Sequence, residues 1–283
     1  MTRSSSPPRT EERRFRSATE PALESASAFD RFARFYDLDT ENVEDDIPLW
    51  TALARRTGGP VLELACGTGR VLLPLARAGL AVVGVDVSAA MLAAARAKVQ
   101  AASVQSRVEL IQADVLELAL DRRFPLAIIA LDSFGHFVDG DAPRRALERI
   151  RQHLLPDGIL ALDLTNPVPG AFGDTTGLIF HDYTRPGPDP GWSTTKLRSQ
   201  RQDFISQCIT VQCIYDELGP EGQIRRTILP FILRYFHPRE IELLLQLTGF
   251  EIEGFYGSYE LDPLTNESER LVVVARAQPE EAQ

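Results

Sequence analysis

Residues 61–70 read VLELACGTGR, an apolar run that ends at two glycines flanking a threonine and has Glu63 in its middle. Strands that alternate with segments of helical period predict a parallel sheet with right-handed crossovers, covered on both faces. The sequence therefore predicts an α/β fold. Besides the first run, the expected strands are LAVVGVD (80–86), SRVELIQADV (106–115), PLAIIALD (125–132) and GILALDLT (158–165).

The composition argues against several classes of protein. The 283 residues are 44% hydrophobic and 25% charged, enough apolar material for a full core in one large or two small domains. A net charge of −10 argues against a nucleic-acid surface, because phosphate binding requires clustered Lys and Arg. No stretch approaches the roughly 18–20 consecutive apolar residues of a membrane span. Three cysteines without CxxC spacing suggest neither a disulfide framework nor a metal site, and we expect a reducing, cytoplasmic compartment.

Two segments differ in pattern from the rest of the chain. Residues 1–26 are rich in Ser, Pro and Arg and lack the apolar stretch of a secretory signal, so a disordered tail is predicted, with a transit peptide as the less favoured alternative. Within residues 171–236, period-2 alternation in CITVQCIYDEL (208–218) predicts consecutive antiparallel strands. We therefore expect one domain over residues 27–283 that carries a β insertion as a lid or substrate region.

The glycine turn after the first strand limits the ligand classes. In an open α/β sheet the ligand lies at the carboxyl ends of the strands, where glycines let the backbone approach it. A P-loop would need a Lys followed by Ser or Thr after the second glycine, and this chain has neither there. A dinucleotide fingerprint would need Gly or Ala at the position of Leu72, so a dinucleotide ligand is disfavoured but not excluded. S-adenosylmethionine carries a sulfonium cation and no phosphate, so it favours carboxylates such as Glu63 near the turn. Asp86, 19 residues after Gly67, suits the ribose of either cofactor.

Four motifs occur together in order and spacing: VLELACGTGR, VVGVDVSAAML (82–92), IQADVLEL (111–118) and LLPDGILALDL (154–164). With them, the stretch from Tyr36 to Asn166 resembles the class I S-adenosylmethionine-dependent methyltransferases. The late insertion and the FYD at residues 35–37 look like the small-molecule branch, which includes sugar-amine and glycine-type N-methyltransferases. The resemblance implies a Rossmann-like, seven-stranded, mostly parallel sheet with N-terminal helices over the cofactor. It also implies methyl transfer from S-adenosylmethionine to the nitrogen or oxygen of a small molecule, by in-line displacement.

The resemblance further implies a role for each matching residue. Glu63, Gly67 and Gly69 would form the cofactor turn, with Glu63 at the methionine amino end. Asp86 would bind both ribose hydroxyls. The other implied cofactor contacts are Met91 against the adenine, Asp114 and Val115 at the adenine edge, Leu131 near the methionine portion, Arg70 near its carboxylate, and Tyr36 over the cofactor.

Acceptor chemistry is expected where the fourth and fifth strands end. His136 in DSFGHF (132–137) and Asp132 are the candidates for a general base, and Asn166 follows the fifth strand. We expect a small-molecule acceptor as the partner, and we expect neither nucleic acid nor a membrane. The sequence does not decide between a monomer and a homodimer. One alternative is a non-catalytic S-adenosylmethionine-binding protein that uses its β insertion as a partner surface. Another is a nicotinamide-dependent oxidoreductase or epimerase, which Leu72 and the lack of a recognisable Tyr-x-x-x-Lys pair disfavour.

Overall fold

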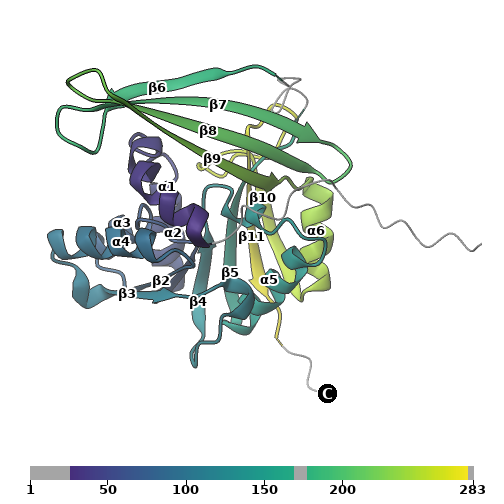
Figure 1. Ribbon diagram of the computed structural model, residues 1–283. Coiled ribbons are helices and arrows are strands. Elements are labelled where there is room, and N and C mark those ends of the chain that lie inside the picture. Colours follow the sequence, from purple (N-terminus) through teal and green to yellow (C-terminus); the bar gives the residue numbers. More distant parts are fainter. Residues whose placement is uncertain (1–25, 169–176, 280–283) are drawn as a thin grey trace, which may run out of the picture.

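The apolar runs of the sequence form one seven-stranded sheet, which we call the main sheet (Figure 1). The computed structural model describes residues 26–168 and 177–279, so the predicted tail, apart from Ala26, and the start of the predicted insertion lie outside the described residues. The strand order is β10-β11-β5-β4-β1-β2-β3, and β11 alone runs in the direction opposite to the other six strands. This confirms the predicted, mostly parallel sheet. These strands are β1 (Val61–Leu64), β2 (Val82–Asp86), β3 (Val108–Gln112), β4 (Phe124–Ile129), β5 (Leu154–Thr165), β10 (Phe250–Tyr256) and β11 (Arg270–Ala277).

Helices cover both faces of the main sheet (Figure 1). Successive strand residues point to opposite faces, so the continuous apolar runs make both faces apolar. On β1, Leu62 joins a core cluster with residues of α5 and α6, whereas Val61 joins a second cluster with residues of α2, α3 and α4. Ser88 caps α4, since its Oγ accepts from the Met91 amide at 3.1 Å. The helices are α1 (Ala26–Asp39), α2 (Ile47–Thr57), α3 (Leu72–Arg77), α4 (Ala89–Ala101), α5 (Ala142–Gln152) and α6 (Pro238–Leu247), with 3₁₀ turns η1 (Gln105–Arg107), η2 (Val115–Glu117) and η3 (Ser133–His136).

Four antiparallel strands form a second sheet, which we call the insertion sheet. Figure 1 shows it spread over α1, so that this helix lies between the insertion sheet and the main sheet. Phe35 of α1 packs with Tyr215 and Phe231 of the insertion sheet in a third core cluster. Among the described residues, no helix is both long and apolar enough to cross a bilayer. The strands are β6 (Phe180–Pro186), β7 (Ser193–Asp203), β8 (Cys208–Leu218) and β9 (Ile224–Arg234).

Candidate functional site

The turn after β1 is bound to the carboxylate that ends β2. Gly67 and Gly69 have positive φ angles of 53° and 85°, which a side chain would strain. The Gly67 amide donates to Asp86 Oδ2 at 2.8 Å, and the Ser88 amide donates to Oδ1 at 2.9 Å. Burial raises the pKa of the Asp86 carboxyl against these two donors, which lower it. The structure thus places the glycine turn and Asp86 side by side at the carboxyl edge of the main sheet.

Glu63 carries a buried carboxyl group, one oxygen of which has no hydrogen-bond partner among the described residues. The residue is 3% exposed, and that oxygen is Oε2. Burial raises the pKa of Glu63 to about 8, although the Arg70 charge opposes the shift. An unpaired buried oxygen of this kind costs free energy, and a cationic ligand would offset that cost. S-adenosylmethionine brings an ammonium group, so Glu63 fits this cofactor.

We expect cofactor binding to release close to one proton at pH 7. The raised pKa keeps most Glu63 protonated in the free protein at pH 7, whereas an adjacent ammonium favours the carboxylate and lowers its pKa. The affinity should therefore rise with pH up to about 8, the pKa of Glu63 in the free protein. Calorimetry of S-adenosylhomocysteine binding in buffers of different ionisation enthalpy measures the release. Glu63→Gln should release none, and a wild-type value of zero would contradict the assignment.

Helix α1 lies over the glycine turn. The Tyr36 ring is so close to Gly67 that a Cβ on the glycine would lie 3.4 Å from it. Asp37 accepts from Thr68 Oγ1, and Asp30 accepts from Ser88 Oγ, both at 2.6 Å. Neither aspartate is among the site residues predicted from the sequence. Their separation of seven residues, which places them on one helix face, was the available signal.

Arg70 is held inside the protein by Asp46. Its guanidinium donates to both Asp46 oxygens at 2.6 Å and to the Val43 carbonyl at 2.9 Å. Asp46 is fully buried and also accepts from Trp50 Nε1 at 2.7 Å. The predicted contact between Arg70 and the cofactor carboxylate therefore competes with an internal ion pair, and it stays a prediction.

The residues predicted to contact adenine lie beyond Asp86 on the same edge. Met91 is buried in the first turn of α4, and Val115 is buried in η2. Asp114 is exposed and caps η2, accepting from the Leu116 amide at 2.8 Å. The cap engages only Oδ1, so Oδ2 is not used by this hydrogen bond. The contact of Asp114 with adenine stays a prediction.

Asp132 belongs to an ionic cluster where β4 and β5 end. Its Oδ2 accepts from Thr165 Oγ1 at 2.8 Å and from Arg270 at 3.1 Å. Arg270 also pairs with Asp163, which is fully buried and accepts from the Leu131 amide at 3.0 Å. Neither Asp163 nor Arg270 is among the site residues predicted from the sequence. An acid inside an apolar strand, the signal that drew attention to Glu63, also applied to Asp163.

His136, which is partly buried, and Asn166, which is buried, lie near this cluster. The His136 ring packs edge-on against Phe29, with 5.0 Å between centroids, and burial lowers the pKa of His136 to about 4. Asn166 is buried, and its Nδ2 donates to the Ser268 carbonyl at 2.8 Å. The structure therefore brings both residues to the predicted edge, and their roles toward an acceptor stay predictions.

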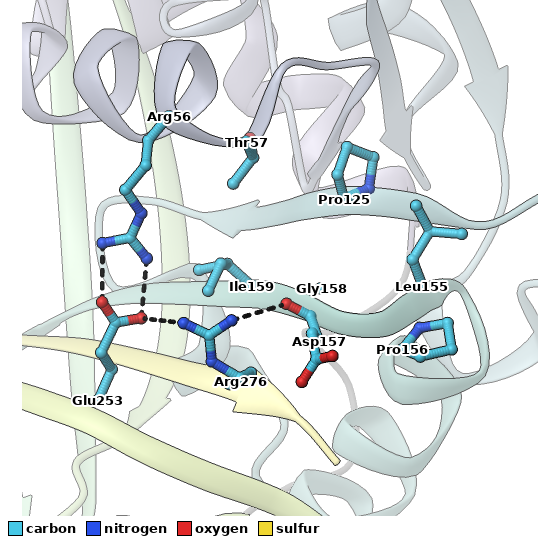
Figure 2. A pocket seen from close by; sticks show the side chains of 10 residues that line it. All are labelled: Arg56, Thr57, Pro125, Leu155, Pro156, Asp157, Gly158, Ile159, Glu253 and Arg276. Atoms are coloured by element: carbon cyan, nitrogen blue, oxygen red, sulfur yellow. Dashed lines mark hydrogen bonds and ion pairs between the residues drawn. The ribbon is translucent and has the colours of Figure 1, made fainter. Parts of the chain in front are cut away.

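A cavity of about 510 Å³ lies at the opposite edge of the main sheet, beside the amino ends of β4 and β5. Figure 2 shows Arg56 and Arg276 on either side of Glu253 within it. Ligands of open α/β sheets bind at the carboxyl edge, and none of the predicted site residues lines this cavity. It is therefore not the candidate cofactor site.

Comparison with known proteins places the chain among methyltransferases. Residues 61–158 match the family model described as a methyltransferase domain. The dTDP-3-amino-3,6-dideoxy-alpha-D-glucopyranose N,N-dimethyltransferase of Streptomyces fradiae is 35% identical over 209 residues, which cover 73% of this chain and 76% of the relative. The cypemycin N-terminal methyltransferase of a Streptomyces species is 28% identical and covers 90% of this chain and 100% of its own length.

A solved structure supports the same fold. The CcbJ methyltransferase from Streptomyces caelestis has a TM-score of 0.77 and 25% identity, over 90% of this chain and 99% of its own. All of these proteins are methyltransferases, so the nicotinamide-dependent alternative has no support among them. Because identity of 35% extends over three quarters of one such enzyme, the chain belongs to the class I S-adenosylmethionine-dependent methyltransferases.

Proposed function

We propose that the protein methylates an amino group of a small-molecule acceptor, bound where β4 and β5 end and covered by the insertion sheet. The observation that carries the choice of nitrogen is that burial weakens His136 as a base, while Asp132 is already engaged by hydrogen bonds. His136 has a pKa of about 4, and Asp132 already accepts from Thr165 and Arg270. Proton transfer to so weak a base contributes little against a hydroxyl acceptor.

An amine does not need such a base once it is neutral. Its lone pair attacks the methyl carbon in line, the nitrogen–carbon bond forms as the carbon–sulfur bond breaks, and the product ammonium later loses a proton to water. The chain contributes alignment of the two reactants and exclusion of water. The insertion sheet and α1 supply the cover, and S-adenosylmethionine supplies the activated methyl group when bound. The two relatives described above are named for acting on an amino sugar and on a peptide amino end, which supports a nitrogen acceptor.

Matched acceptor pairs test this proposal. Each pair shares one scaffold and differs only in an amino or a hydroxyl group, with amino sugars and short peptides as the two amine sets. Mass spectrometry after incubation with S-adenosylmethionine records which member gains a methyl group. Methylation of the amino members supports the proposal, and methylation of the hydroxyl members alone would overturn it.

We expect kcat/KM to rise with pH until the acceptor amine is deprotonated, with no inflection from His136 near pH 6–7. Its pKa of about 4 keeps the imidazole neutral across that range. His136→Ala should then lower kcat by about 10-fold or less, through lost packing on Phe29, and leave S-adenosylhomocysteine affinity unchanged. A loss of about 10²- to 10⁴-fold together with loss of an inflection would instead make His136 a general base.

A further inference from the structure

One carboxylate at the end of α1 receives donors from three strands of the insertion sheet. Tyr183 of β6 donates its hydroxyl to Asp39 Oδ1 at 2.7 Å. Lys196 of β7 donates to Asp39 Oδ2 at 2.6 Å, and Tyr215 of β8 donates to the same oxygen at 2.8 Å. The Asp39 and Lys196 side chains are only 11% and 13% exposed, so solvent screens these charge-assisted bonds little.

The three donors form a single row across the sheet. Tyr183 pairs with Lys196, and Lys196 pairs with Tyr215, so all three side chains point to the same face. The Lys196 ammonium lies 6.0 Å and 5.9 Å from the centroids of the two tyrosine rings. Burial and the neighbouring Asp39 charge raise the pKa of both tyrosines, which therefore remain hydroxyl donors. We call these three residues and Asp39 the Asp39 row.

The same helix reaches the cofactor turn with its other side chains. Asp30 and Asp37 accept from Ser88 and Thr68, while Tyr36 lies beside Gly67. Helix α1 therefore contacts the insertion sheet on one side and the glycine turn on the other. Helix α1 can therefore move away only if its bonds to the insertion sheet or its bonds near the glycine turn break.

We propose that Asp39 is a positioning residue that links the insertion sheet to the cofactor turn through α1, so that cofactor binding and placement of the insertion sheet stabilise each other. Such linkage is reciprocal. A cofactor bound beneath Tyr36 favours the docked helix, and the docked helix holds the Asp39 row in place. Conversely, loss of the Asp39 bonds weakens cofactor binding although Asp39 does not contact the glycine turn.

Hydrogen exchange with and without S-adenosylhomocysteine tests the linkage in the full chain. In the wild type, the ligand should slow exchange in both the glycine turn and strands β7 and β8. In Asp39→Asn, the ligand should still protect the turn, no longer protect β7 and β8, and bind about 10-fold more weakly. The matched control is Asp216→Asn, because Asp216 follows Tyr215 on β8 but pairs with Arg226 of β9. It should behave as the wild type.

Two outcomes would overturn the proposal. One is ligand protection of β7 and β8 that is equal in Asp39→Asn and the wild type, and the other is no such protection in the wild type. A structural role alone would lower the melting temperature without changing how the ligand affects these strands. If Asp39→Asn does not fold, the double variant Tyr183→Phe and Tyr215→Phe removes two donors with little change in volume and is judged by the same two measurements.

Discussion

Replacing Asp86 with Ala is expected to lower the affinity for S-adenosylhomocysteine by at least about 100-fold. Asp86 accepts from the Gly67 and Ser88 amides, and its residue is only 8% exposed. The substitution leaves these two amides unpaired, at about 1–3 kcal/mol each, and removes the predicted charge-assisted bonds to the ribose, worth about 1.5–3 kcal/mol each. The turn and the ligand therefore lose their shared anchor at the same time.

Titration calorimetry measures this loss, and a thermal melt shows whether the variant is folded. Asp86→Asn keeps the volume but places an amide nitrogen against one of the backbone donors, so an intermediate loss is expected. Asp141→Ala removes an exposed aspartate that pairs with Arg144 and should leave the affinity unchanged. Wild-type affinity in Asp86→Ala would mean that the ribose binds elsewhere.

Gly67→Val is expected to abolish measurable cofactor binding by a different route. The positive φ of 53° disfavours any side chain, and a β-branched one most of all. The new Cβ would also lie 3.4 Å from the Tyr36 ring, in the space between the turn and α1. Valine would therefore displace either the turn or the helix that covers it.

Gly79→Val separates backbone strain from loss of the site. Gly79 also has a positive φ, of 91°, and an added Cβ there would meet no atom within 4 Å. Both variants should lose stability, measured by chemical denaturation, but only Gly67→Val should lose S-adenosylhomocysteine binding. Equal affinities in the two variants would show that Gly67 does not border the ligand.

The sequence predicted the main sheet because its inner strands are buried on both faces and therefore read as continuous apolar runs. The position of Gly67 near Asp86 also follows from the sequence, since adjacent parallel strands bring their carboxyl ends to one edge. The insertion sheet was harder to predict in detail. β7 reads STTKLRSQRQD and lacks the clear alternation of β8, because most of its side chains are only partly buried.

Contacts that depend on register or on distant residues were not predictable. The Asp39 row exists because Tyr183, Lys196 and Tyr215 are directly opposite, and alternation alone does not give the register between strands. Nothing in the sequence around Arg70 indicates that its guanidinium forms an ion pair with Asp46. Likewise, the pairing of Asp163 with Arg270 spans 107 residues, and a single sequence contains no trace of it.

The position of β11 determines when the main sheet is completed during synthesis. This strand lies between β5 and β10, yet it follows both of them in the chain. A nascent chain that has not reached Arg270 leaves β5 with an open edge, β10 without a partner strand, and Asp132 and Asp163 without their shared cation. The implied cofactor contacts, from Tyr36 to Leu131, are all translated before Arg270, so the sheet edge that carries Asp132 and Asp163 receives its last strand only after them.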